Sequence, residues 1–385
     1  MGFDKACKVN GCAGTDEPCQ PFGAVQVAAV RAPAQRGQTG MIRVCQNRGK
    51  PMAVLFVSGV NDPSKIEVTL DDKGRIGYLL DGNCSVLHRM DLGTREVAEV
   101  LIFGKRVRQT GLEFNRRPSL IFNQIADPDT HRGSLERCIE LCESVDSPVI
   151  NHPRSVMRSS RERVSAALQG IPGVTMPRTI RFQPRSPREV VRRAMAEGFG
   201  FPFLVRIAGL HGGVSMVRVD RPDDHSAMHA LPFDGRDFYL AEFIDFQSSD
   251  GLYRKTRVVV VDGVPLVRHL LINTDWMVHA SSGDFMDRHP PLLEEARSVL
   301  ADFDRSIRPR VEPATTAIAE RLGLDFFGID CHIDEAGQMI VFEANANMNV
   351  LYNRRAMYQP CLDVIKKHLL RLIDARGAGS GRKTG

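Results

Sequence analysis

Two carboxylates and an amide lie at the ends of a predicted hairpin, in the segment GIDCHIDEAGQMIVFEANANMN at residues 328–349. The tetrapeptide DEAG supplies Asp and Gly, which favour a tight reversal between two antiparallel strands. Because side chains alternate along a strand, Glu343 and Asn345 point the same way, and Asp330 comes near the same open end. Three hard oxygen ligands suit a Mg²⁺ ion that keeps several waters and takes phosphate oxygens from a nucleotide.

Two other interpretations of this hairpin stay open on its residues alone. In the first, DEAG closes a surface hairpin whose acids are solvated. In the second, Asp330 and Asp334 precede the glycine of a calcium loop, although the Asp-x-Asp-x-Asp-Gly order and the terminal Glu of such loops are missing. The choice among these three interpretations of the hairpin depends on motifs in the rest of the chain.

The composition is typical of a soluble globular chain with two or three domains. Of 385 residues, 43% are hydrophobic and 25% are charged. The net charge of +5 is small beside 51 basic and 46 acidic side chains, and one Trp and five Tyr offer little base stacking, so we expect no nucleic-acid partner. The chain shows neither an 18-residue apolar run nor the apolar core of a signal peptide, and its nine cysteines are scattered. We therefore expect a cytoplasmic protein with reduced thiols and no membrane partner.

The first part of the chain predicts a small α/β domain behind a flexible extension. Residues 1–50 are rich in Gly, Pro, Gln and Arg, and only Met41–Cys45 is expected to form a strand there. Residues 51–150 begin with the buried strand MAVLFVSG at 52–59 and continue with further strands at KIEVTLDD, RIGYLLDG, SLIFN and PVIN. Alternation of strands with helices indicates a mostly parallel sheet.

Helices are expected in this domain at Thr94–Phe103 and from Ser134, as a cap, to Val145. The next helices are expected at Arg158–Leu168 and after the cap Ser186. From FPFLVRIAGLHGGVSMVRVD onward, the pattern changes to strand, glycine loop, strand, which is typical of antiparallel hairpins.

The last part of the chain continues with strands at YLAEFIDF, TRVVVVDG and PLVRHLLI. A helical stretch at Pro291–Leu322 then leads into the first hairpin described above. His269 and the segment DWMVH are interpreted as core packing. The tail at residues 377–385, rich in Gly and Ser, is expected to be disordered.

Four segments occur in one order, FPFLVRIAGLHGG, YLAEFID, YRKTRVVVVDG, and GID followed by FEANAN. Together they resemble the ATP-grasp superfamily, the fold of D-alanine:D-alanine ligase, glutathione synthetase and the ribosomal-protein glutamate ligases. The separation of thirteen residues between Asp330 and Glu343, with Asn345 two further on, matches the magnesium motif of that family. The resemblance implies an α/β (α+β) chain in which residues 51–150 form a small parallel-sheet domain. An ATP-grasp domain with two lobes would follow at residues 151–376, with its hinge near residues 240–245.

The resemblance also implies roles for individual residues. Asp330, Glu343 and Asn345 would hold Mg²⁺, or Mn²⁺ in its place, between the ATP phosphates. Arg206 stands where the family usually has a phosphate-binding Lys, and an Arg can clamp phosphate through its planar fork. The flexible flap over the phosphates would consist of Gly209, His211, Gly212 and Gly213, because glycines let backbone N–H groups approach closely.

Three further assignments follow from the same match. Glu242 falls at the hinge where backbone groups read the adenine, and Arg257 matches an Arg that faces the phosphates or the reacting acyl group. Arg161 or Arg163 takes the place of a Lys that contacts the nucleotide, and the sequence does not choose between them. Each also has a plain structural interpretation, as an exposed charge on a half-buried strand or helix.

The activity implied is ligation of a carboxylate to an amine through an acyl phosphate, with release of ADP and phosphate. The substrates would be small molecules or peptides, and a homodimer would be ordinary for the family. Two departures from the family pattern, Arg206 in place of Lys and NANMN without a Pro-Gly turn, keep open a regulator that binds Mg·ATP without turnover. A phosphotransferase or thioester-forming ligase that uses His211 is a further alternative.

Overall fold

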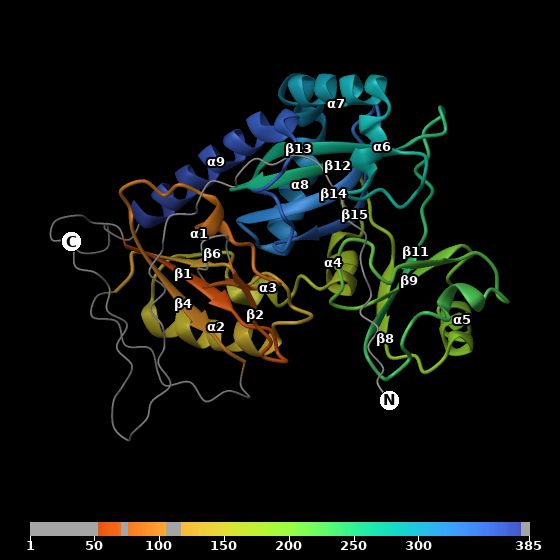
Figure 1. The fold of residues 1–385 in the computed structure, drawn as a ribbon, viewed down its shortest axis with the longest axis horizontal. Coiled ribbons are helices and arrows are strands. Elements are labelled where there is room, and N and C mark those ends of the chain that lie inside the picture. The colour runs from red at the N-terminus through yellow and green to blue at the C-terminus, as the bar shows by residue number, and fades with distance from the viewer. Residues whose placement is uncertain (1–52, 71–75, 105–116, 379–385) are drawn as a thin grey trace.

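The computed structural model describes residues 53–70, 76–104 and 117–378 (Figure 1). The expected flexible extension at residues 1–50, its strand at Met41–Cys45 and the tail from residue 379 lie outside these ranges. Figure 1 shows three parts: a first domain, a small lobe that carries α5, and a large lobe under α7 and α9.

The first domain is built on a parallel sheet of order β4-β1-β5-β6. Its strands are β1 (Ala53–Gly59), β4 (Glu96–Ile102), β5 (Leu120–Asn123) and β6 (Val149–Ile150). Alternate residues of β1 pack on α2 (Arg132–Val145) or on α9 (Gln359–Ala378), so both faces of the sheet are covered. Short elements complete the domain: β2 (Glu67–Leu70), β3 (Ile76–Leu79), α1 (Val86–Arg89) and α3 (Pro153–Val156).

Three expectations for helices were wrong in detail. Thr94–Phe103 contains the strand β4, because its β-branched residues pair with β1 along the full strand. Ser134 lies inside α2 instead of capping it, and its hydroxyl donates to the Val60 carbonyl at 2.5 Å. The helix expected from Arg158 begins at Arg161, as α4 (Arg161–Leu168), with Ser160 at its N-cap.

The small lobe is an antiparallel sheet of order β10-β9-β11-β8. Its strands are β8 (Thr179–Phe182), β9 (Phe203–Ile207), β10 (Val217–Val219) and β11 (Phe238–Glu242). The helix α5 (Pro187–Ala196) starts as predicted, with the Ser186 hydroxyl accepting the Glu189 N–H at 3.3 Å. Leu240 and Val205 fill its core, together with the 3-10 turn η1 (Ser226–Met228).

The large lobe is a five-stranded sheet of order β13-β12-β14-β15-β7. Its strands are β7 (Val174–Thr175), β12 (Tyr253–Val261), β13 (Val264–Asn273), β14 (Phe326–Ile333) and β15 (Met339–Asn345). The predicted helical stretch is divided into α7 (Pro290–Asp302), a π-helical turn η2 (Phe303–Ile307) and α8 (Arg308–Leu322), while α6 (Ser282–Asp287) precedes it and η3 (Ala356–Tyr358) leads into α9.

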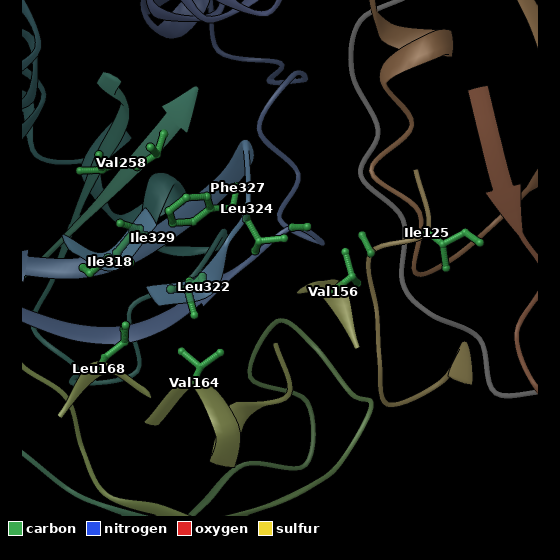
Figure 2. Close-up of a cluster of buried hydrophobic side chains, with 14 of the residues drawn as sticks. Ile125, Val156, Val164, Leu168, Val258, Ile318, Leu322, Leu324, Phe327 and Ile329 are labelled. Atoms are coloured by element: carbon green, nitrogen blue, oxygen red, sulfur yellow. The ribbon is translucent and has the colours of Figure 1, made fainter. Parts of the chain in front are cut away.

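One hydrophobic core joins the first domain to the large lobe. Figure 2 shows Val156 between Ile125 of the first domain and Phe327 of β14, and all three side chains are at most 1% exposed. This shared core fixes the first domain beside the large-lobe sheet. Within the described residues, none of the helices has the length and apolarity needed to cross a membrane.

Candidate active site

The hairpin of β14 and β15 brings the predicted metal ligands together. Its register sets Asp330 directly opposite Glu343, and the Asn345 side-chain nitrogen donates to Glu343 Oε1 at 2.6 Å. The turn is closed as the sequence predicts, since Asp334 Oδ1 accepts the N–H groups of Ala336 and Gln338 at 2.9 and 2.8 Å. The register shifts by one residue after Asp330, and such bulges re-aim side chains near functional sites.

Both acids are held by cations from other elements. The Arg257 guanidinium donates to the two oxygens of Asp330 at 2.6 and 2.9 Å, and Lys255 Nζ lies 3.3 Å from the same carboxylate. Arg161, at the start of α4, donates to Glu343 Oε1 at 2.5 Å. Both carboxylates are therefore already neutralised by ion pairs within the protein.

The pKa values of both acids follow from these pairs. Burial alone would raise the pKa of Asp330, but Arg257 and Lys255 outweigh it and lower the pKa well below its usual range. Burial would likewise raise the pKa of Glu343, but the charges of Arg161 and Arg206 outweigh it and lower this pKa to about 2. Both groups are therefore carboxylates at neutral pH, the form that a metal ion requires.

The donor set fits a small hard cation. Two carboxylates and the Asn345 amide oxygen are ligands that Mg²⁺ and Mn²⁺ accept. Among the described residues, no three or more His, Cys, Asp or Glu side chains form a metal cluster by themselves. The Asn345 oxygen accepts the Asn347 N–H at 2.9 Å, which leaves one of its two lone pairs. A bound cation would share Asp330 and Glu343 with Arg257 and Arg161.

Arg206 approaches this hairpin from the small lobe. On β11, Tyr239 is paired with Arg206 of β9 on one side and with Arg181 of β8 on the other. Burial, followed by the nearby charge of Arg161, lowers the pKa of Arg206 to about 10. Its guanidinium donates to the Leu210 carbonyl, and its buried Nε has no hydrogen-bond partner. A buried cation with a donor to spare is suited to an anion.

The glycine loop after β9 folds over the hairpin. Gly209, Gly212 and Gly213 have φ values of +76°, +67° and +78°, which L side chains rarely adopt, and a Cβ on Gly209 would meet Thr130 Cγ2 at 2.8 Å. His211 Nε2 lies 3.1 Å from Asp127 Oδ2 and 3.1 Å from the Asn347 side-chain nitrogen. The loop therefore contacts both the first domain and the segment after the metal motif.

A small cavity lies where these parts meet. Its lining comes from four places in the chain, and nine of the lining residues have polar side chains: Asp127, Asp129, Ser159, Ser160, Arg161, His211, Glu343, Asn345 and Asn347. Sequence reasoning missed Asp127 and Asp129. The sequence does contain a feature that points to them, the polar run ADPDT shortly after the buried strand β5. Ligands of parallel sheets bind at the carboxyl ends of the strands, so polar residues at this position are candidates for a binding site.

The remaining predicted residues are placed apart from this cavity. Glu242, at the end of β11, accepts the backbone N–H of Arg178 at 2.9 Å. Arg163 is more than half exposed and donates to the Met157 carbonyl at 3.0 Å, whereas Arg161 lines the cavity. Of the two candidates on α4, the structure brings only Arg161 to Glu343.

The single Trp of the chain lies close to the end of β11. Trp276 packs edge-on against Phe243 with ring centroids 5.5 Å apart, and the Arg218 guanidinium lies 5.8 Å from its ring. The neighbouring Met277 faces the flap, with its sulfur 3.3 Å from a Cβ built on Gly213. The fluorescence of Trp276 is thus placed to respond to changes around Phe243 and the glycine loop.

Comparison with solved structures identifies the fold. The structure superposes on the VanG D-Ala:D-Ser ligase of Enterococcus faecalis with a TM-score of 0.51 and 12% identity, covering 85% of this chain and 100% of that one. It superposes on the D-alanine-D-alanine ligase of Coxiella burnetii with a TM-score of 0.50 and 11% identity, covering 87% and 96%. The chain has the ATP-grasp fold, with mixed parallel and antiparallel sheets, as its sequence motifs predict.

Sequence comparison adds one distant relative. The chain is 22% identical over 278 residues to human N-acetylaspartylglutamate synthase A, an alignment that covers 70% of this chain and 65% of that protein. The chain thus spans slightly less than two thirds of the length of this curated relative. No family model matches the chain.

Proposed function

We propose that the protein is an ATP-dependent ligase that joins a carboxylate to an amine and releases ADP and phosphate. The observation that supports it is the meeting, around one cavity, of Glu343 and Asn345 with Arg161 and the glycine flap. Arg206 adds a buried cation with an unpartnered donor. This is the arrangement of charges that transfer of a phosphoryl group requires.

The reaction would proceed in two steps. A carboxylate oxygen of the substrate attacks the γ-phosphorus of ATP and the bond to the bridging oxygen breaks, which gives an acyl phosphate and ADP. An amine then attacks the acyl carbon, phosphate leaves, and the amine loses a proton. Mg²⁺, when bound, would neutralise charge on the phosphate oxygens. Arg206 would bind the phosphates, and the flap carrying His211 would exclude water that hydrolyses the acyl phosphate.

The finer assignments belong to the same proposal. Residues 151–376 would form the catalytic unit with a hinge near residues 240–245, and residues 51–150 would contribute Asp127 and Asp129. The substrates would be small molecules or peptides, in a cytoplasmic location. The human relative is named for a product that joins an acidic residue to glutamate, which makes acidic amino acids and short acidic peptides the first substrates to test.

A second function, a regulator that binds Mg·ATP without turnover, has one observation in its favour. Both metal-binding acids are held by arginines, Asp330 by Arg257 and Glu343 by Arg161. A site whose charges are already paired without a ligand can bind a nucleotide without catalysing its reaction.

The experiment measures ADP and phosphate released from Mg·ATP in the presence of amino acids, dicarboxylic acids and short peptides. Glu343→Gln is compared with Glu335→Gln, which changes an exposed acid in the turn of the same hairpin. We expect acid-stimulated release that falls by about 10²- to 10³-fold in Glu343→Gln only. ATP binding is followed in parallel by the fluorescence of Trp276.

Each outcome separates the two functions. Release that requires an acid and an amine supports the ligase. Magnesium-dependent ATP binding with no release for any substrate supports the regulator. Absence of ATP binding in the wild-type protein contradicts both.

A further inference from the structure

A bulge in β13 brings two basic side chains to one place. Arg257 of β12 pairs with His269, and the next residue Val258 pairs with Val267, so Arg268 is the extra residue on β13. In a regular strand, adjacent side chains point to opposite faces. Here the Arg268 guanidinium contacts His269 Nδ1 directly, because the extra residue turns both side chains toward each other.

This pair lies in a region with an excess of positive charge. Arg257 and Lys255 are both paired with the single carboxylate of Asp330. Arg268 is 4% exposed and makes no ion pair within the described residues. Burial, then the charge of Arg257, lowers the pKa of Arg268 to about 10, and burial with the same arginines lowers the pKa of His269 well below its usual range. A buried cation without a counterion is unfavourable unless a ligand supplies the negative charge.

Two hydrogen-bond donors of the pair have no acceptor. An arginine only donates, so His269 Nδ1 accepts from Arg268, and the ring carries its proton on Nε2. That Nε2 and Arg268 Nε are both buried without a partner. His269 is 6% exposed, so solvent hardly reaches it. Both groups donate, and an oxygen anion is the ligand that would satisfy both.

The segment after β15 contacts the pair and its neighbour Arg257 through backbone carbonyls. Arg268 Nη2 donates to the carbonyl of Tyr352, and Arg257 Nη1 donates to the carbonyl of Asn349 at 3.2 Å. Asn349 and Tyr352 are both exposed, and they belong to the segment that directly follows the metal motif. Their carbonyls are neutral acceptors, which a carboxylate can replace with stronger, charge-assisted bonds.

We propose that Arg268 and His269 form a subsite that binds a carboxylate of the substrate other than the one that becomes activated. The subsite would restrict the enzyme to substrates with a side-chain carboxylate beside the carboxylate that is activated, such as acidic amino acids or acidic peptides. This inference rests on the proposed ligase function. The row across the sheet from Glu343 through Asp330 and Arg257 to His269 places the subsite on the side of the metal motif that is away from Glu343.

The test measures binding of acids by titration calorimetry in the absence of nucleotide. L-glutamate and L-aspartyl-L-glutamate are each compared with the matching amide, L-glutamine or L-asparaginyl-L-glutamine. We expect the wild-type protein to prefer an acid over its amide by at least about tenfold, an energy typical of a charged hydrogen-bond pair. Arg268→Met should remove the preference and Arg268→Lys should keep part of it.

A matched control is Arg254→Met on the neighbouring strand. Arg254 is paired with Asp250 and Glu295, so its loss should leave acid binding unchanged. Since Arg268 is an uncompensated buried cation, Arg268→Met should unfold without ligand at the same temperature as the wild type or higher. A lower unfolding temperature together with an unchanged acid preference would show a structural role and overturn the proposal.

Other results are also decisive. If Arg268→Met does not fold, His269→Gln and Arg268→Lys carry the test, and an undiminished acid preference in both overturns the subsite. An equal affinity of the wild type for acids and amides overturns it as well. Binding of Mg·ATP, followed by Trp276 fluorescence, is measured separately, so its absence contradicts the ligase function without deciding the acid subsite.

Discussion

Two sheets carry charged side chains near the cavity, and they differ in how these charges are balanced. On the large lobe, Asp330 and Glu343 are both paired with arginines. On the small lobe, Arg181 is paired with Asp129 and Asp237. Arg206 lies near enough to Glu343 to lower the pKa of that acid, but in the described part of the chain it makes no ion pair, and its Nε has no partner. The large-lobe face can hold its shape without a ligand, whereas the small-lobe face is complete only when an anion arrives.

The largest effect on ligand binding is expected from a substitution of Arg206, the cation without an ion-pair partner within the described residues. Arg206→Met removes a cation that has no ion-pair partner among the residues that the structure describes, and we expect the affinity for ATP to fall by about 10- to 100-fold, the loss of one or two charged hydrogen bonds. Without ligand the variant should unfold close to the wild type, because the cost of burying Arg206 beside Arg161 offsets its attraction to Glu343. Thermal unfolding and nucleotide titration measure the two quantities.

Arg206→Lys is the matched control, because it keeps the charge and loses the planar fork. It should recover most of the ATP affinity. A stability loss in Arg206→Met with unchanged ATP affinity would mean that Arg206 is structural, and the contrast between the two sheets would then fail.

A smaller effect is expected from substitutions on the large lobe, where each acid is paired with an arginine. Arg161→Met leaves Glu343 without its closest cation, and we expect the free energy of unfolding to fall by about 1–3 kcal/mol, below the value for fully buried pairs because both side chains are about one fifth exposed. Added Mg²⁺ should restore more stability to this variant than to the wild type, since the cation no longer competes with Arg161. Denaturant unfolding with and without Mg²⁺ measures both.

Arg163→Met on the same helix is the control, because Arg163 is exposed and its guanidinium lies 3.9 Å from Glu162. It should unfold within about 0.5 kcal/mol of the wild type. Equal losses in the two variants would show that Glu343 does not depend on Arg161.

The hairpin that carries Asp330, Glu343 and Asn345 could be predicted because it is local. The tight turn sets the register up to Cys331, and the bulge after Asp330, which the sequence does not show, then places Asp330 opposite Glu343. The helix predicted at Thr94–Phe103 was wrong for the opposite reason. A short apolar run is compatible with a helix or a strand, and here the distant pairing with β1 makes it a strand. The identity of the fold was predicted from the order of motifs.

The partners of the motif could not be predicted, because they come from distant parts of the chain. Arg161 is 182 residues before Glu343, and Asp127 is 84 residues before His211. The bulge at Arg268 leaves no mark in the run of valines and leucines around it, so the sequence pattern places Arg268 and His269 on opposite faces. These residues are positioned by packing between domains and by irregular strand pairing, and neither of these can be derived from local sequence patterns.

The smallest effect concerns the flap, in which His211 contacts both Asp127 of the first domain and Asn347 after β15. Asp127→Asn weakens the contact of the Asp127 carboxylate with His211, and we expect the flap to open more often by about 1 kcal/mol, which is about a fivefold change. Amide hydrogen exchange at residues 209–214 should accelerate by that factor in the ligand-free protein. Asp62→Asn is the control, because Asp62 accepts the Gly133 N–H in the same domain and lies apart from the flap contacts. Exchange that is equal in both variants would mean that the flap is held by Asn347 and its backbone alone, and that the first domain has no part in closing the site.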